Sequence, residues 1–198
     1  MARSRLLWIA AGLVGLAELA VAGLVLVPRA DPSYRAYFID KISDCWPHQT
    51  DGHYTLGTTL WFATGHSPDF TPNKICGWFY PSAEGDWSYG DYSLLLLVFP
   101  PVETPLTLTL TAAAMTTPAH PIQRVIVTAN GATLGTINFE GGAPQTKTLD
   151  VPAAIAGSGG MQLRFIYLDA RPGTELGPNE DAHLRAIRMV SLTLAPTK

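Results

Sequence analysis

The sequence predicts an all-β protein, an antiparallel jelly-roll-type β-sandwich preceded by a single N-terminal transmembrane helix. Segments with strand character recur at near-regular spacing, with turn residues and no helical periodicity between them. Gly and Pro are frequent, at 18 and 16 residues, as expected of many turns between short strands. Near the N-terminus, one apolar stretch is long enough to cross a bilayer. In a chain of 198 residues, one anchor and one domain of about 150 residues fit without strain.

The transmembrane helix is predicted over residues 6–27, a stretch whose one charged residue is Glu18. At 1.5 Å per residue such a helix is about 33 Å long, which exceeds a hydrocarbon core of about 30 Å. Arg3 and Arg5 precede it without a nearby acidic residue. The positive-inside rule therefore places residues 1–5 in the cytoplasm and the rest of the chain on the opposite side.

A cleaved signal peptide is the alternative interpretation of the same stretch. Ala20-Val21-Ala22 has the small-x-small pattern of a cleavage site. Apolar residues continue beyond it to Val27, which favours an anchor. We therefore expect the anchor to be followed by a partly extended juxtamembrane segment, 28–53, and then by the extracytoplasmic domain, 54–198.

Small residues and one acidic residue share a face of the predicted helix. Ala11, Gly15, Glu18 and Ala22 are spaced i, i+4, i+7 and i+11. Small side chains let a second helix approach closely, and a polar group among them can hydrogen-bond across the contact. A carboxylate facing lipid would instead cost a few kcal/mol or more. We therefore predict that this face packs on another membrane protein; the alternative is a protonated Glu18 tolerated on a lone anchor.

The two cysteines, Cys45 and Cys76, both fall on the predicted extracytoplasmic side. Cysteines in an oxidising compartment most often pair. A disulfide that closes a loop of about 32 residues would stabilise the fold by about 3–4 kcal/mol. The histidines are scattered along the chain and do not complete a zinc site with two cysteines, so we expect no metal and no other cofactor.

About nine segments of the domain have strand character, and three features are the most informative. Tyr92–Phe99 is almost continuously apolar, which indicates a strand buried on both faces. Pro105–Ala112 alternates Leu with Thr, which indicates one buried and one outward face. Asn130-Gly131 is a preferred two-residue hairpin turn. The predicted strands are Tyr54–Phe62, Ile75–Tyr80, Tyr92–Phe99, Pro105–Ala112, Ile122–Thr128, Thr133–Phe139, Thr146–Val151, Met161–Leu168 and His183–Leu194.

Short motifs containing Gly and Trp punctuate the domain. They are Leu56-Gly57, Gly65, Gly77-Trp78, Glu84-Gly85-Asp86-Trp87-Ser88-x-Gly90, Asn130-Gly131, Val151-Pro152 and Pro172…Leu176-Gly177…Asp181. Together they resemble the β-sandwich domain appended to bacterial membrane glycosyltransferases and other cell-envelope polysaccharide proteins. The resemblance covers about Tyr54 to Leu194. It implies a jelly-roll fold like that of carbohydrate-binding modules, in the cell envelope, with no enzyme activity of its own.

The chain departs from that family's pattern before its last strand. Where the family usually shows Asp-x-Arg-x-Leu-Gly, this chain has Asp181-Ala182-His183-Leu184-Arg185-Ala186. A ligand site built on the family's Arg therefore does not carry over by position.

The candidate ligand-binding residues lie in the most specific part of the resemblance. They are Trp78, Tyr80, Glu84, Asp86 and Trp87, with Phe79 and Asp91 nearby. Flat aromatic faces pack on the C–H faces of sugar rings, and carboxylates bind sugar hydroxyls, so the group predicts a sugar platform. The alternative is that both tryptophans are core or corner residues of the sandwich, as large apolar side chains usually are.

Catalysis is not expected, because no catalytic motif is present. Glu84 and Asp86 flank Gly85 in a predicted turn, whereas glycoside hydrolysis needs two carboxylates across a cleft. Ser88 and Ser93 are not in a nucleophile elbow, and there is no phosphate-binding loop or dinucleotide fingerprint. The protein is therefore not predicted to be an enzyme.

Charge and topology define the expected partners. Without Arg3, Arg5 and Glu18 the chain has 11 basic and 15 acidic residues and no basic stripe, so nucleic acid is not an expected partner. We expect a bacterial inner-membrane protein with a periplasmic domain. The first hypothesis is a non-catalytic accessory subunit whose helix packs in a larger complex, such as an energy-transducing or photosynthetic one, and whose domain stabilises or bridges partners. The alternative is a membrane-tethered carbohydrate-binding module that assists cell-envelope glycan synthesis. The expected partners are thus other membrane subunits, the lipid bilayer and, in the alternative, a glycan.

Overall fold

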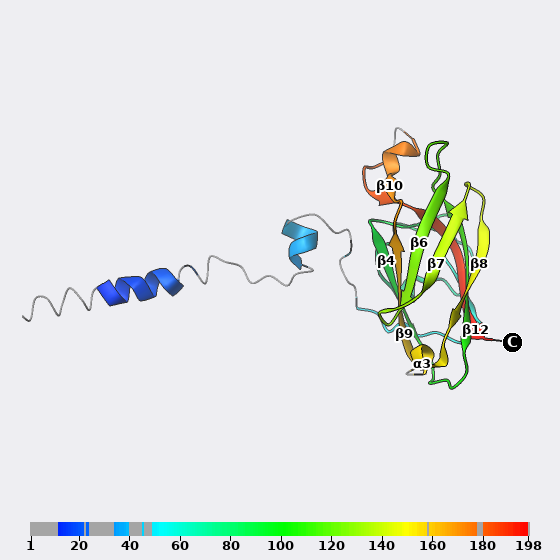
Figure 1. The fold of residues 1–198 in the computed structure, drawn as a ribbon, viewed down its shortest axis with the longest axis horizontal. Helices are drawn as coiled ribbons and strands as arrows, with labels where there is room; N and C mark the ends of the chain where they lie inside the picture. Colours follow the sequence, from blue (N-terminus) through cyan, green and yellow to red (C-terminus); the bar gives the residue numbers. More distant parts are fainter. Residues whose placement is uncertain are drawn as a thin grey trace, which may run out of the picture.

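The computed structural model describes residues 12–21, 23, 34–39, 45, 49–157, 159–177 and 180–197. In this part of the chain, two antiparallel sheets face each other across a hydrophobic core (Figure 1). Each sheet has five strands among the described residues. The predicted antiparallel β-sandwich is therefore confirmed.

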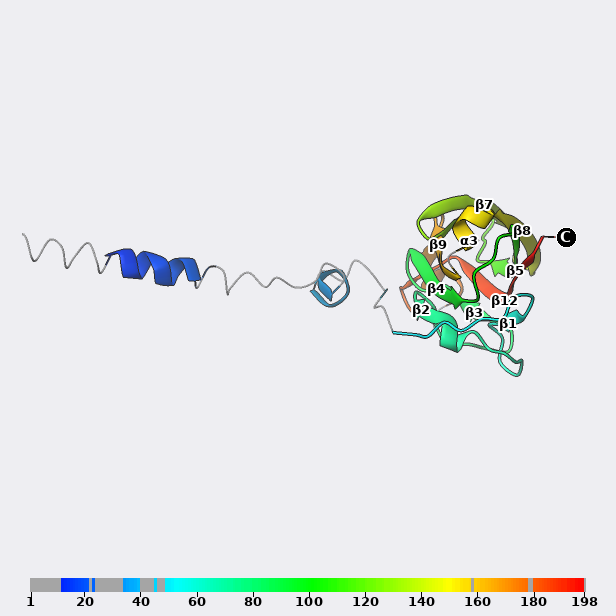
Figure 2. The same ribbon diagram turned by 90° about the horizontal axis from the view of Figure 1, so that it is seen from below.

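Sheet A has the strand order β2-β4-β9-β6-β7, and sheet B has the order β1-β12-β5-β8, with β3 pairing with β12 beside β1. Seen from below, the two sheets separate clearly (Figure 2). The strands of sheet A are β2 (Lys74–Cys76), β4 (Tyr92–Val98), β6 (Ile122–Ala129), β7 (Ala132–Glu140) and β9 (Gly160–Tyr167). Those of sheet B are β1 (Thr59–Trp61), β3 (Asp86–Trp87), β5 (Leu106–Ala114), β8 (Gln145–Val151) and β12 (Ile187–Pro196). The remaining elements are the strand pair β10 (Arg171–Pro172) and β11 (Leu184–Arg185) and the short helices η1 (Arg35–Ile39), η2 (Thr71–Asn73), α3 (Ala153–Ala156) and η3 (Gly173–Glu175).

The strand pairing is nested. Among the strands β1, β4 to β9 and β12, the first pairs with the last, β1 with β12. The next pairs inward are β4 with β9, β5 with β8 and β6 with β7. A long hairpin rolled up on itself gives this pattern, which is the pairing of a jelly roll. Thr59 and Thr193, at the two ends of the domain sequence, are register partners.

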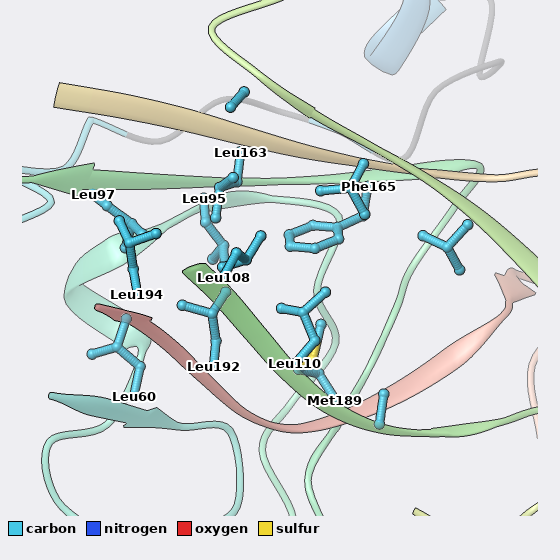
Figure 3. Packing of buried hydrophobic residues seen from close by; sticks show 14 of the residues in the cluster. Leu60, Leu95, Leu97, Leu108, Leu110, Leu163, Phe165, Met189, Leu192 and Leu194 are labelled. Atoms are coloured by element: carbon cyan, nitrogen blue, oxygen red, sulfur yellow. The ribbon is translucent and has the colours of Figure 1, made fainter. Parts of the chain in front are cut away.

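Alternation along the strands builds the core. On β5, Leu106, Leu108 and Leu110 are buried, while the threonines between them lie on the outer face. Figure 3 shows Leu108 and Leu110 packed with Leu192 of β12 and with Leu95 and Phe165 from sheet A. Burial of each such side chain stabilises the fold by about 1.5–3 kcal/mol. The predicted alternation of this strand is confirmed.

The hairpin between β6 and β7 turns at Asn130-Gly131, as predicted. Both residues have positive φ, 49° and 82°, as a type I′ turn requires. The Asn130 side chain accepts a hydrogen bond from the Gln162 amide at 2.8 Å and donates one to the Gly160 carbonyl at 2.9 Å. The turn residue thus also fixes the hairpin to the neighbouring strand β9.

Two predicted strands are shorter than expected, and in both cases a glycine with positive φ interrupts the extended backbone. The segment Tyr54–Phe62 is a strand only at Thr59–Trp61, because the chain turns at Gly57, whose φ is 86°. The segment Ile75–Tyr80 is a strand only up to Cys76, because Gly77 has a φ of 77°.

The predicted disulfide is confirmed between Cys45 and Cys76, whose Cα atoms are 5.0 Å apart. With Ile75, the two cysteines form a small cluster against Tyr92, Leu94 and Leu96, on the outer face of β4. The inward residues of β4 are fully buried in the main core. The strand is thus covered on both sides, which explains its continuous apolar sequence. Most of the predicted juxtamembrane segment, 28–53, lies outside the described residues.

The predicted transmembrane span, 6–27, is described only at residues 12–21, which are helical, and at residue 23. No helix in the described part of the chain is long and apolar enough to cross a membrane. Of the predicted packing face, Gly15 and Glu18 lie on this helix, and Ala11 and Ala22 lie outside the described residues. The apolar side chains of the helix are exposed. In both views the helix lies apart from the sandwich (Figures 1 and 2).

Candidate functional site

The candidate ligand residues belong to two antiparallel segments, 77–80 and 86–90, which we call the 77–90 hairpin. The Phe79 amide donates to the Trp87 carbonyl at 3.0 Å, and the Tyr89 amide donates to the Gly77 carbonyl at 2.8 Å. Ser82 and Gly85 close the turn between the segments. Because successive residues of an extended chain point to opposite sides, the hairpin has an inward and an outward face.

Two glycines let this hairpin pack backbone to backbone on its neighbours. Gly77 and Gly85 have φ values of 77° and 128°, which L side chains rarely adopt. A Cβ atom on Gly77 would lie 2.2 Å from the Tyr92 carbonyl oxygen, and one on Gly85 would lie 2.2 Å from the Met189 carbonyl oxygen. The motif that carries the family resemblance is therefore explained to a large part by close packing.

Trp78 lies on the inward face and is only 5% exposed. Its ring contacts Phe62, Phe70 and Phe165, with ring centroids 5.0–5.8 Å apart. The indole Nε1 donates a hydrogen bond to the Leu94 carbonyl at 3.2 Å. The structure thus places Trp78 in the core, in line with the alternative interpretation of this residue, and not on a surface open to a ligand.

Asp86 also points inward and is fully buried. Neither carboxylate oxygen has a hydrogen-bond partner among the described residues. Burial raises the pKa of Asp86 to about 7, against the opposing effects of Lys74, of the nearby Phe79 and Trp87 amides and of Arg185. The Lys74 ammonium donates to the Phe79 carbonyl at 2.7 Å, and burial lowers its pKa. Asp86 is therefore an ionisable residue buried inside the fold, where a ligand on the surface cannot contact it.

Arg185 joins the segment before the last strand to the hairpin. Its side chain is buried, and its Nη2 donates to both carboxylate oxygens of Asp181 at 3.2 and 3.1 Å. The guanidinium lies 4.1 Å from the ring centroid of Phe79 and 5.1 Å from that of Tyr89. Such contacts contribute about 0.5–2 kcal/mol each. The Arg in the sequence that departs from the family pattern is thus packed between aromatic rings.

A series of aromatic rings, which we call the aromatic surface, runs from the exposed Tyr80 at the end of the segment 77–80 across the outward face of the hairpin to His183. The rings follow one another with centroid distances of 5.1 Å for Tyr80–Phe79, 5.6 Å for Phe79–Tyr89 and 4.3 Å for Tyr89–His183. Tyr80 is 77% exposed, and the other three are partly or largely accessible. Tyr89 and His183 were not predicted as site residues, because they come from segments far apart in the sequence and only the tertiary contact brings them together.

Trp87 and Glu84 both contact Arg188 of β12. The Arg188 guanidinium is 5.5 Å from the Trp87 ring centroid, and its Nη1 pairs with the exposed Glu84 carboxylate. Trp87 and Arg188 are register partners on β3 and β12. Of the five candidate ligand residues, the structure therefore brings Tyr80, Glu84 and Trp87 to the surface and buries Trp78 and Asp86.

A cavity of about 190 Å³ opens beside this hairpin. The loop that follows β1 forms most of it, and Pro81 of the hairpin turn closes one side. A second cavity of about 150 Å³ shares Asp69 with the first. Sequence analysis missed both cavities, since a loop rich in Gly, Pro and Asp carries no local sign of what packs around it. Among the described residues, no cluster of His, Cys, Asp and Glu has the arrangement of a metal site.

Among known proteins, the chain has structural neighbours but no match in sequence. No family model matches the chain. No curated protein matches it in sequence. Among solved structures, the chain is similar to several carbohydrate-binding modules.

Three of these solved structures align with this chain over nearly their whole length. A family 36 carbohydrate-binding module in complex with calcium and xylotriose is 14% identical, over 75% of this chain and 95% of that one, with a TM-score of 0.36. The xylan-binding module of family 15 is 10% identical, over 73% and 95%, with a TM-score of 0.44. A family 35 module from an environmental isolate is 14% identical, over 77% and 96%, with a TM-score of 0.37. At this level of similarity no ligand of these modules carries over to this chain.

Proposed function

We propose that this chain is a non-catalytic glycan-binding module, tethered to a bacterial inner membrane and serving cell-envelope glycan synthesis. The observation that carries the proposal is the aromatic surface with its exposed Tyr80, together with Trp87, whose ring lies 5.5 Å from the Arg188 guanidinium that pairs with Glu84. Aromatic faces pack on the apolar faces of sugar rings, and the charged pair supplies hydrogen-bond acceptors and donors for hydroxyls. The membrane tether rests on the apolar sequence of residues 6–27.

The arrangement of the carboxylates supports binding without catalysis. Glycoside hydrolysis needs two carboxyl groups about 5–10 Å apart that flank one open cleft. Here Asp86 is fully buried and points inward, while Glu84 is exposed and paired with Arg188. One acid of the motif is thus buried and the other exposed, and no substrate can contact both.

The test is glycan binding by the full chain, purified in a detergent without a sugar headgroup. A glycan array identifies the ligand, and titration calorimetry measures its affinity for the wild type and for the double variant Tyr80→Ala/Trp87→Ala. We expect a loss of affinity of tenfold or more, about 1.4 kcal/mol, because both stacking rings are removed. Tyr34→Ala, which removes an exposed ring outside the sandwich, is the matched control. Equal affinity of the double variant and the wild type would contradict a site on the aromatic surface.

A second candidate is the accessory subunit of a larger membrane complex, in which the helix contacts another membrane protein. The observation that favours it is the described helix 12–21, on which Leu16 and Leu19 are exposed and Gly15 and Glu18 share a face. Co-purification from native membranes tests it. Glu18→Leu is expected to release the partner, and Glu18→Gln, which keeps a hydrogen-bonding group, is expected to retain it. An unchanged set of co-purifying proteins with both variants would exclude this helix contact.

A further inference from the structure

The two cavities at the loop after β1 form one preorganised site. The loop is closed at its base, since the Trp61 amide donates to the Pro68 carbonyl at 3.0 Å and the Phe70 amide donates to the Trp61 carbonyl at 3.1 Å. The Thr64 amide also donates to the Ser82 carbonyl at 2.8 Å, which fastens the loop to the turn of the 77–90 hairpin. Backbone hydrogen bonds thus hold the cavity walls before any ligand arrives.

The larger cavity combines an aromatic wall with polar side chains. The Trp61 ring lines it and stacks on His66, with centroids 4.5 Å apart and ring planes 22° from parallel. Phe62 and Phe70, both fully buried and stacked at 4.0 Å, form its apolar base. The polar lining comes from Thr64, His66, Asp69 and Thr71. A ring with one apolar face and several hydroxyl groups matches this lining.

Asp69 is the residue that the two cavities share. Its Oδ1 accepts a hydrogen bond from the Thr71 amide at 2.9 Å, and Oδ2 has no such partner among the described residues. The smaller cavity adds His53, Tyr54, Thr55, Thr58 and Asn73 to its lining. One carboxylate can therefore accept hydrogen bonds from hydroxyls of two consecutive rings.

The volumes of the two cavities and the charges of their lining limit the class of ligand that fits. Each cavity is smaller than the roughly 300–1,000 Å³ of sites for drug-sized molecules, so each fits about one ring. No Lys or Arg lines either cavity. Phosphate groups and uronic acids, which are recognised by such cations, are therefore disfavoured beside Asp69.

We infer that the paired cavities bind two consecutive neutral sugar units, with Trp61 stacking on one ring and the Asp69 carboxylate bonding hydroxyls of both. The inference rests on the proposed function and deepens it, because it assigns a second binding site and a neutral ligand class. Pro81 lines the larger cavity and follows Tyr80 in the sequence. A glycan chain held in the cavities can therefore continue onto the aromatic surface.

The test is titration calorimetry with the full chain in a detergent without a sugar headgroup. The probes are cellobiose, xylobiose, lactose and chitobiose as neutral disaccharides, a trisaccharide of the best of them, and methyl glucuronide as the acidic sugar. We expect Trp61→Ala and Asp69→Asn each to weaken disaccharide binding tenfold or more. The side-chain oxygen of Asn can still accept the hydrogen bond from the Thr71 amide. The loop is therefore expected to stay folded in the Asp69→Asn variant. Asp150→Asn, on the outer face of β8, is the matched control and is expected to change affinity by less than twofold.

A second readout follows from the charge of Asp69. Methyl glucuronide is expected to bind at least tenfold more weakly than a neutral disaccharide, and Asp69→Asn is expected to narrow that difference. If both cavity variants bind the best disaccharide like the wild type while Tyr80→Ala/Trp87→Ala loses the trisaccharide, the cavities are not the site and the proposed function stands. If the wild type binds none of the probes and no array glycan, both proposals are wrong.

Discussion

The inward and outward faces of the 77–90 hairpin carry similar residues in different environments. Inward lie Trp78 and Asp86, both buried and closely packed. Trp87, the neighbour of Asp86, points outward and is partly exposed, and Tyr80, at the turn end of the segment 77–80, is 77% exposed. The same motif therefore holds the fold together on one side and offers a binding surface on the other. A residue type such as Trp does not indicate function by itself, because its position in the hairpin decides which side it serves.

The largest expected effect is on the inward face, at Trp78. Trp78→Ala is expected to destabilise the fold by about 3–5 kcal/mol, because it leaves a cavity among aromatic side chains in the core. The free energy of unfolding from urea titration of the purified chain measures this. Loss of less than about 1 kcal/mol would mean that Trp78 is not part of the core.

The next effect is expected at Gly85, where the hairpin backbone meets β12. Gly85→Ala is expected to cost about 2–4 kcal/mol, from a strained φ and from crowding of the Met189 carbonyl. The same urea titration measures it. Gly142→Ala is the matched control, because an added Cβ there meets nothing within 4 Å. Similar stabilities of the two variants would contradict the close backbone approach.

The third effect depends on pH and comes from Asp86. Its pKa in the folded chain, about 7, lies above its ordinary value of 3.8. Between these values the folded state holds a proton that the unfolded state has lost, so stability is highest below about pH 4 and falls as pH rises to about 7. Asp86→Asn removes this titration. Between pH 5 and pH 8 the stability of Asp86→Asn relative to the wild type is expected to increase by about 3 kcal/mol, since the interval below the folded pKa spans about two pKa units at about 1.4 kcal/mol each.

Unfolding titrations of wild type and Asp86→Asn at several pH values measure that difference. Asp150→Asn, an exposed carboxylate on β8, is the control and is expected to keep the pH dependence of the wild type. A difference between wild type and Asp86→Asn that does not vary with pH would show that Asp86 titrates normally.

The smallest effect on stability is expected on the outward face. Tyr80→Ala is expected to change the free energy of unfolding by less than about 0.5 kcal/mol, because the side chain is exposed. The same variant is expected to weaken glycan binding. A large loss of stability without a loss of binding would show that Tyr80 stabilises the fold and does not bind the glycan.

Much of the fold could be predicted from the sequence, because local patterns report it. The alternation of β5, the continuous apolar sequence of β4, the Asn130-Gly131 turn and the disulfide all appear in the structure as predicted. In each case the signal is confined to a few neighbouring residues or to a pair with no other partner. The membrane anchor stays a prediction, since the described residues include only part of the segment 6–27.

Fewer features of the candidate site could be predicted from the sequence, because contacts between residues far apart in the sequence determine them. Whether Asp86 points inward depends on its pairing with β12, which follows about 100 residues later. The cavity at Trp61 depends on the hydrogen bond between Thr64 and Ser82 and on a wall from Pro81. No local pattern encodes contacts of this kind.

The nested pairing has a consequence for how the domain forms. Strand β12, the last of the chain, lies between β1 and β5 in the middle of sheet B. Pairing of such distant segments is slow, because a long loop must close before the contacts stabilise it. Until β12 is available, β1 and β5 present open edges on which other chains can add. Sheet B therefore cannot form before β12 is available, and deletion of residues 187–196 is expected to be more harmful than deletion of a surface loop.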